Sequence, residues 1–397
     1  MIDPISLCQE LIRCESVTPK DAGCLDIIEG YLKPLGFVCH RLPFGQNDPL
    51  ATDNLYARWG NSGPNFCFAG HTDVVPVGDL ARWTVDPFGA DIKDGRLYGR
   101  GTVDMKGAIA AFISAVADVI QNHQPGCSFS LLLTSDEEGP ATFGTKKVIE
   151  WLKGRGEIID ACLVGEPTNP QIFGEMVKIG RRGSLNTKVT VTGKQGHVAY
   201  PHFAVNPIPA LLGYLMQLLQ KPLDEGTDHF MASNLEVTSV DVGNPVTNVI
   251  PNQASARFNI RFNSLHTGQR LVDYLQAVKE MVSKTFSPQL QWTLEPVISG
   301  ESFMSNHQGL QQAVVKAIET VTGLTPKLDT SGGTSDARFL KDICPVIEFG
   351  LISDQAHQID EYLVIEDLTS LTGVYKNILC QSFLEPEDSN LREIIAE

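Results

Sequence analysis

Residues 66–73 read Phe66-Cys67-Phe68-Ala69-Gly70-His71-Thr72-Asp73. The apolar first half is typical of a buried strand, and the second half places an imidazole and a carboxylate where that strand ends. Such polar groups are costly to bury unless they are paired or bound to a metal. This stretch therefore predicts a sheet strand that leads directly into a functional site.

Other short apolar runs are also followed by acidic or imidazole side chains. Residues 129–133 precede Asp136-Glu137-Glu138-Gly139, residues 161–164 precede Gly165-Glu166-Pro167, and residues 346–349 precede His357. The carboxyl ends of parallel strands meet at one edge of a sheet, and ligands bind there. Two histidines and several carboxylates that converge at this edge would form a site for two divalent metals. Such a site indicates metal-assisted hydrolysis.

The composition excludes several classes of function. The chain has 397 residues, more than one compact core usually supports, so two domains are expected. Lys+Arg number 31 and Asp+Glu 47, and the net charge of −16 argues against a nucleic-acid partner. The longest apolar stretch, residues 108–120, is too short to span a bilayer, so no membrane partner is expected.

The cysteines and the N-terminus bear on the cellular compartment. The nine cysteines are scattered and none forms a CxxC pair, which favours reduced thiols over a disulfide framework. The chain begins Met1-Ile2-Asp3-Pro4, without a basic segment ahead of an apolar one, and so shows no signal peptide. Together these features predict a cytoplasmic protein.

Helical and strand patterns alternate in the first part of the chain. Helices are expected at residues 4–14, 21–35, 104–122 and 142–153, and strands at residues 66–69, 128–134 and 161–165. This alternation predicts an α/β fold with a mostly parallel central sheet. After residue 294 the alternation of helical and strand patterns returns, with helices expected at residues 309–322 and 366–383 and a strand at residues 345–349.

The intervening stretch has a different texture. Residues 184–192, 234–242 and 254–262 alternate as half-exposed strands do, and helices are expected at residues 206–220 and 268–284. Two strand–helix units of this kind predict a small α+β domain over residues 182–294. His357 must reach a site built in the first part of the chain. We therefore predict a catalytic domain of residues 1–181 and 295–397, interrupted by this inserted domain.

Each candidate site residue also has a simpler interpretation. His71 and Asp73 would face the same way in an extended chain, so Asp73 could accept the second N–H of the imidazole. In isolation, such a pair is more often solvated or satisfied within the core. Asp104 could simply cap the apolar helix that follows it. However, Gly99-Arg100-Gly101 gives a close backbone approach that a cap does not need, and the two oxygens of Asp104 could bridge two ions.

The adjacent Glu137 and Glu138 would ordinarily be solvated at a strand end. Alternatively, one ligates metal while the other acts as general base toward water. Glu166 could lie in an exposed loop, and His357 could be a structural histidine. Oxygen and nitrogen ligands without a nearby cysteine suit Zn, Co or Mn rather than a structural thiolate zinc.

Four motifs resemble the dizinc aminoacylase/carboxypeptidase family of metallohydrolases, and the resemblance runs from about residue 5 to 385. The motifs are residues 71–76 (HTDVVP), 98–107 (YGRGTVDMKG), 137–139 (EEG) and 165–168 (GEPT). The resemblance implies that His71 and Glu166 ligate one zinc, that Glu138 and His357 ligate the other, and that Asp104 bridges them. It also implies a cis peptide after Asp104, an orienting role for Asp73 and a general-base role for Glu137.

The resemblance further implies two Zn²⁺ per subunit, with Co²⁺ or Mn²⁺ as substitutes, and hydrolysis of an N-acyl amide. The family is typically a homodimer through the inserted domain, which also acts as a lid. The counterpart of His197 reaches into the partner's active site, where it would stabilise the oxyanion. Residues 178–184, 193–201 and 331–336 are similar to the members that act on small N-succinyl amino acids. Acetylornithine deacetylation or dipeptide hydrolysis is the alternative reaction, and a non-catalytic zinc scaffold is an alternative of another class.

A substrate with several carboxylates needs cations and backbone donors. Arg182, Arg261 and Arg338 could form bidentate pairs with carboxylates, although each could be an ordinary surface residue. The glycine-rich turn over residues 330–336 would offer the N–H groups of Gly333 and Thr334. The remaining expected substrate contacts are polar residues of the inserted domain, namely Ser184, Tyr200 and Asn248.

Overall fold

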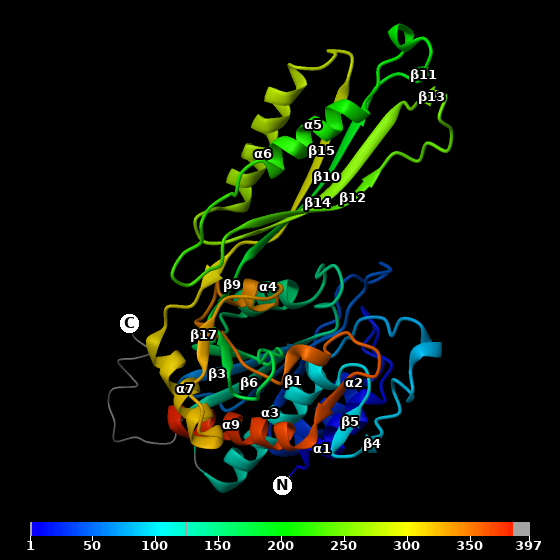
Figure 1. Ribbon diagram of the computed structural model, residues 1–397. Coiled ribbons are helices and arrows are strands. Elements are labelled where there is room, and N and C mark those ends of the chain that lie inside the picture. The colour runs from blue at the N-terminus through cyan, green and yellow to red at the C-terminus, as the bar shows by residue number, and fades with distance from the viewer. Residues whose placement is uncertain (1, 124, 384–397) are drawn as a thin grey trace. The chain divides into compact units, whose positions relative to one another are not determined.

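The computed structural model describes residues 2–123 and 125–383 (Figure 1). The chain divides into two compact units. Among the described residues, the first unit comprises residues 2–123, 125–179, 305–329 and 335–383, and the second comprises residues 180–304 and 330–334. The predicted domain boundaries after residues 181 and 294 stay a proposal, which limited proteolysis would test. None of the described helices is long and apolar enough to cross a membrane.

The first unit is built on an eight-stranded mixed sheet, whose strands lie in the order β1 (Val38–Arg41), β2 (Asn54–Trp59), β6 (Ser128–Thr134), β3 (Asn65–His71), β7 (Ala161–Val164), β18 (Val346–Glu348), β8 (Met176–Lys178) and β17 (Lys327–Asp329). The central strands β6, β3, β7 and β18 run parallel. Every residue of β3, β6 and β7 is buried, which explains their continuous apolar runs. The prediction of an α/β fold with a mostly parallel central sheet is confirmed.

Helices pack around this sheet. They are α1 (Pro4–Ile12), α2 (Cys24–Leu32), α3 (Gly107–Asn122), α4 (Thr145–Arg155), α7 (Gln308–Thr322), α8 (Ala337–Leu340) and α9 (Ile365–Phe383). Helix α3 contacts α1 and α9 (Figure 1). Its residues 107–119 are all buried, so the helix is covered on nearly every side. The expected helix at residues 104–122 begins later, at Gly107, because Asp104 and Met105 have non-helical backbone dihedrals and a cis peptide between them.

A small three-stranded sheet also belongs to the first unit. Its strands are β4 (Ile92–Lys93), β5 (Arg96–Tyr98) and β19 (Tyr362–Val364), with β5 in the middle. The short helical turns of this unit are η1 (Lys33–Leu35), η2 (Leu80–Arg82), η3 (Thr102–Lys106) and η5 (Ser353–Gln355). The predicted ligand Asp104 lies in η3, which follows β5, and the predicted ligand His357 lies between η5 and β19. The small sheet therefore helps to position both residues.

The second unit contains an antiparallel sheet in the order β12 (Asn234–Asp241), β14 (Gln253–Phe262), β10 (Gly183–Thr192) and β15 (Gln291–Gly300). Helices α5 (Ile208–Leu219) and α6 (Gly268–Ser283) bury one face of it around Tyr214, Phe258 and Leu275. The remaining elements are β9 (Gly180–Arg181), β11 (Gly196–His197), β13 (Val249–Ile250), β16 (Phe303–Met304) and the turn η4 (Pro201–Phe203). Strand β15 was not predicted from the sequence.

Candidate metal centre

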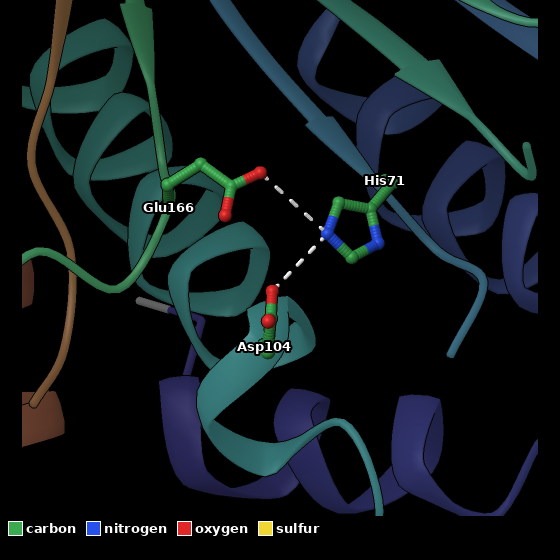
Figure 2. A group of neighbouring side chains, drawn as sticks. All are labelled: His71, Asp104 and Glu166. Carbon is green, nitrogen blue, oxygen red and sulfur yellow. Dashed lines mark hydrogen bonds and ion pairs between the residues drawn. The ribbon is translucent and has the colours of Figure 1, made fainter. Parts of the chain in front are cut away.

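Three candidate ligands meet at the carboxyl ends of two neighbouring strands (Figure 2). His71 is the last residue of β3, Glu166 follows β7, and Asp104 precedes α3. His71 Nε2 lies 3.2 Å from Asp104 Oδ1 and 3.7 Å from Glu166 Oε1. One ligand atom from each residue lies within 4.8 Å of the other two, which is close enough to surround a metal ion.

A second cluster joins Asp104 to Glu138 and His357. His357 Nε2 lies 2.8 Å from Glu138 Oε1 and 3.2 Å from Asp104 Oδ2. The three ligand atoms again lie within 4.8 Å of one another. Asp104 therefore belongs to both clusters and directs a different carboxylate oxygen toward each imidazole, as a carboxylate that bridges two ions must. The structure brings all five predicted ligands together, and their roles as ligands stay a prediction.

The chemistry of these side chains fits divalent ions. Every donor is an imidazole nitrogen or a carboxylate oxygen, the set that suits zinc and its catalytic substitutes. Hydrogen bonds with Asp104 and Glu138 raise the pKa of His357 to about 10. Burial opposes charge on His71, but its hydrogen bond with Asp104 and the charge of Glu166 prevail and raise its pKa well above the usual range. The carboxylates around both imidazoles thus favour positive charge at this site.

Loading the metal-free protein with Zn²⁺ at pH 8 should therefore release protons. The pKa of His357 is about 10, so its imidazolium must lose a proton before the ring can coordinate. For each imidazolium proton displaced, apparent zinc affinity should rise about tenfold per pH unit between about pH 7 and 9. Calorimetric titration in two buffers of different ionisation enthalpy counts these protons. His357→Ala should release fewer protons, and a wild-type count of zero would contradict the prediction.

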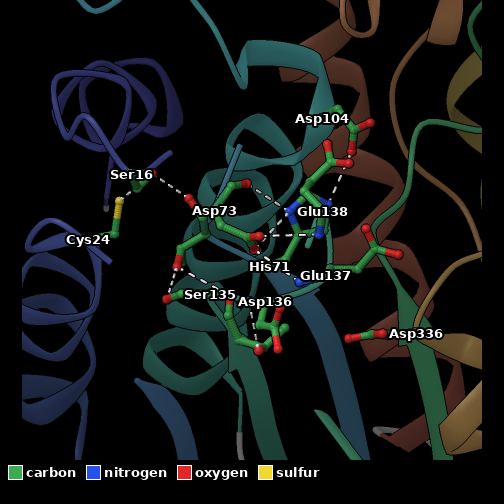
Figure 3. A network of polar contacts seen from close by, with 12 residues as sticks. Ser16, Cys24, His71, Asp73, Asp104, Ser135, Asp136, Glu137, Glu138 and Asp336 are labelled. Carbon is green, nitrogen blue, oxygen red and sulfur yellow. Dashed lines mark hydrogen bonds and ion pairs between the residues drawn. The ribbon is translucent and has the colours of Figure 1, made fainter. Parts of the chain in front are cut away.

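Asp73 acts on His71 differently from the prediction. The main-chain carbonyl of Asp73 lies 2.9 Å from His71 Nδ1, whereas its carboxylate oxygen Oδ1 lies 3.6 Å away. The carbonyl is therefore the group that can accept the Nδ1 proton and leave Nε2 directed at Asp104. The carboxylate of Asp73 instead accepts the backbone N–H groups of Glu137 and Glu138, at 3.3 and 3.2 Å (Figure 3). Asp73 thus orients the imidazole with its backbone and the glutamate pair with its side chain.

The loop that carries the two glutamates is folded around Asp136. This fully buried carboxylate accepts the N–H groups of Ala141, Thr142 and Phe143, at 3.1, 2.7 and 3.0 Å. The sequence predicts no particular role for Asp136. Its only sequence signal was its place immediately before the glutamate pair.

Glu137 belongs to neither cluster of candidate ligands among the described residues. Burial, followed by the negative charge of Glu166, raises its pKa well above the usual range for a glutamate. A carboxylate that lies next to the ligands, without being one of them, is free to exchange protons. This placement is the one that a general base requires.

The second unit brings the expected catalytic residue His197 close to two expected substrate-binding residues. His197 pairs in register with Val249, next to Asn248, across β11 and β13. The carbonyl of Asn248 accepts the N–H of Val198 at 3.1 Å. The ring of Tyr200 lies 5.6 Å from that of His197, measured between centroids. The structure thus brings His197, Tyr200 and Asn248 together within this unit.

The other substrate candidates of the second unit gather near the start of β10. Ser184 lies opposite Arg261 in the sheet, and Arg261 also lies opposite Asn234. Arg182 donates a hydrogen bond of 2.9 Å to the Asn234 side chain. Gly333 and Thr334 belong to the separate segment 330–334 of this unit. Arg338 lies in α8 of the first unit, where its guanidinium is 3.8 Å from Asp336.

Comparisons with known proteins agree on one family. The sequence profile of peptidase family M20/M25/M40 matches residues 67–381. The succinyl-diaminopimelate desuccinylase of Rhodospirillum centenum is 55% identical over 386 residues, which are 97% of this chain and 98% of that protein.

Two solved structures share the fold. An M20 family metallo-carboxypeptidase from Sulfolobus solfataricus superimposes with a TM-score of 0.77 at 16% identity, covering 96% of this chain and 99% of that one. A dinuclear metal-binding peptidase of the M20 family from Bacillus subtilis gives a TM-score of 0.69 at 15% identity, covering 95% and 96% of the two chains. At such low identity, these two likenesses concern the fold alone.

Proposed function

The chain belongs to peptidase family M20/M25/M40, and on this basis we propose that it hydrolyses N-succinyl-LL-2,6-diaminopimelate to succinate and LL-2,6-diaminopimelate. This reaction belongs to diaminopimelate and lysine biosynthesis. The observation that carries the proposal is 55% identity, over nearly the full length of both chains, to a desuccinylase. Two clusters of candidate ligands that share Asp104 support the proposal, because metal ions held there could promote hydrolysis of an amide.

Each cluster would hold one zinc ion. His71 and Glu166 would ligate the first, Glu138 and His357 the second, and Asp104 both. Co²⁺ and Mn²⁺ are expected substitutes because they accept the same nitrogen and oxygen donors. When bound, the two ions would polarise the amide carbonyl and lower the pKa of the attacking water.

Glu137 would move the proton. It takes a proton from the attacking water, whose oxygen becomes part of the succinate carboxyl group as the carbon–nitrogen bond breaks. It then returns that proton to the leaving amine, so the reaction consumes one water and leaves the enzyme unchanged. The raised pKa of Glu137 makes its carboxylate a stronger base than an exposed glutamate.

Substrate recognition would fall to cations and backbone donors. Arg182, Arg261 and Ser184 lie together in the second unit and would bind substrate carboxylates, with Arg338 as a further cation from the first unit. The backbone N–H groups of Gly333 and Thr334 would bind anionic oxygens.

His197 would stabilise the oxyanion, with Tyr200 and Asn248 beside it. His197 lies beyond the end of β10, whereas Ser184 and Arg261 lie near its start. At about 3.3 Å per strand residue, the eight steps from Ser184 to Thr192 span roughly 26 Å. His197 and Arg261 are therefore too far apart within one chain to act on the same small substrate. A second copy of the chain could complete the site, and we propose a homodimer that forms through the second unit.

Kinetics on the zinc-loaded protein tests this function. N-succinyl-diaminopimelate should give the highest kcat/KM in a panel with N-acetylornithine and dipeptides, and metal analysis should find about two zinc ions per chain. Preference for N-acetylornithine or a dipeptide would favour the sister reactions of the family. Tight zinc binding without turnover of any of these substrates would favour a scaffold.

Arg261→Ala should raise KM for the succinylated substrate by about 10–100-fold, because a hydrogen-bonded charge pair contributes about 1.5–3 kcal/mol. Zinc content and kcat should change much less, since Arg261 lies in β14 of the second unit and outside the ligand clusters. Arg257→Ala is the matched control, because Arg257 is exposed on the same strand. Equal KM values for the Arg261 and Arg257 variants would remove Arg261 from the substrate site.

A further inference from the structure

Two chain segments that carry candidate ligands adjoin the paired strands β5 and β19. Strand β5 pairs antiparallel with β19, with Tyr98 opposite Tyr362. Residues 99–104 run from the end of β5 to Asp104, and residues 357–361 run from His357 to the start of β19. The strand pairing brings the two segments together, and contacts beyond it must fix where the ligands lie.

A buried ion pair joins these segments directly. Arg100 Nη1 lies 2.7 Å from Glu361 Oε2, and the two residues are 2% and 0% exposed. The other oxygen of Glu361, Oε1, accepts the backbone N–H groups of Gly101 and Val103, both at 3.0 Å. Glu361 therefore holds the backbone that leads to Asp104.

Arg100 holds the opposite segment in return. Its guanidinium donates to the carbonyl of Gln358 at 3.0 Å and to that of His357 at 3.4 Å. His357 has a φ of 64°, in the left-handed region that a histidine rarely occupies, so its backbone needs such support. The ring of Trp83 covers the guanidinium, at 5.3 Å from its centroid. Glu361 thus accepts hydrogen bonds from the backbone of the Arg100 segment, and Arg100 donates hydrogen bonds to the backbone of the Glu361 segment.

We propose that Arg100 and Glu361 are positioning residues, which set Asp104 and His357 at the separation that the second metal requires. This inference rests on the proposed two-metal function. A buried ion pair adds little net stability compared with well-packed apolar residues, so its value here lies in fixing a unique arrangement. Arg100 and Glu361 supply that arrangement without touching the metal, as outer partners of metal ligands do.

The first cluster depends less on this pair. His71 ends β3, and Glu166 closely follows the neighbouring β7, so the central sheet itself positions both. His357, by contrast, lies in a loop that Arg100 supports. Disrupting the pair should therefore weaken the ion bound by Asp104, Glu138 and His357 more than the other ion.

Zinc titration of full-length, metal-free variants by calorimetry tests the inference. Glu361→Gln keeps an oxygen for Gly101 and Val103 but presents an amide N–H₂ to Arg100, so it breaks the pair selectively. Arg100→Lys keeps the charge and loses the planar fork that reaches several acceptors at once. In both variants the affinity of the second ion should fall about 10–100-fold, while that of the first changes less. The His357→Ala variant identifies which binding step belongs to the second ion.

The Arg58–Glu157 pair of the same unit offers a matched control, and Glu157→Gln should leave both binding steps unchanged. The double variant Arg100→Lys/Glu361→Gln should lose little more affinity than the worse single variant, because the pair acts as one device. Unchanged binding of the second ion, equal weakening of both ions, or fully additive losses would overturn the inference. A wild-type protein that binds only one ion would instead overturn the proposed two-metal function.

Discussion

Replacing Glu137 with alanine should leave two zinc ions bound and lower kcat by about 10²–10⁴. Glu137 lies outside both ligand clusters, so its loss removes no metal ligand. It removes the carboxylate whose pKa is raised by burial and by Glu166, and with it the group placed to accept a proton from water. Zinc content by elemental analysis and kcat with N-succinyl-diaminopimelate measure the two halves of this expectation.

Two further variants sharpen this test. Glu137→Gln preserves size and should be almost as inactive as Glu137→Ala, because an amide cannot accept the proton. Glu150→Ala changes an exposed glutamate in α4 of the same unit and should behave as wild type. Near-normal turnover in Glu137→Ala would end the general-base assignment, and loss of zinc would make Glu137 a ligand.

Replacing Asp104 with alanine should weaken both zinc ions and abolish measurable turnover. Asp104 is the one residue common to both clusters, and its two oxygens face different imidazoles. Mutation of a residue that hydrogen-bonds to a metal ligand typically lowers metal affinity about 10–100-fold. Removal of a ligand shared by two ions should lower the affinity of each site by more than that. Calorimetric zinc titration and zinc content after dialysis measure the effect.

His71→Ala is the natural comparison, because His71 belongs to the first cluster alone. That variant should lose one binding step and keep the other, whereas Asp104→Ala should weaken both. Circular dichroism of the metal-free proteins checks that both variants fold. Retention of two tightly bound ions in Asp104→Ala would rule out the bridging role.

Much of the candidate metal centre could be predicted because local sequence patterns indicate it. Apolar runs mark the buried strands β3, β6 and β7, and polar side chains directly after them must lie at one sheet edge. His71, Glu137, Glu138 and Glu166 were found from this rule. The same rule indicated His357, although a loop separates it from its strand. Asp104 needed the family resemblance as well, because a helix start offers a weaker local signal.

What the sequence did not reveal depends on contacts between distant segments. The Arg100–Glu361 pair joins residues far apart in the chain and leaves no periodic pattern in the sequence. The hydrogen bond from His71 to the Asp73 carbonyl is local, but it uses a main-chain acceptor that the residue types do not reveal. Strand β15 was missed because only its first half alternates clearly, and it pairs with β10 about a hundred residues earlier in the chain. Backbone acceptors and long-range ion pairs become visible only when the fold is known.

The five candidate ligands come from separate stretches of the polypeptide, between His71 and His357, yet they meet in one compact unit. Ions seated among them would therefore act as reversible cross-links. An ion that binds only the native chain, at a hundredfold excess over its Kd, adds about 2.7 kcal/mol to the free energy of unfolding. Scarcity of zinc would consequently lower the melting temperature as well as the turnover. It would also make the metal-free protein more susceptible to proteolysis.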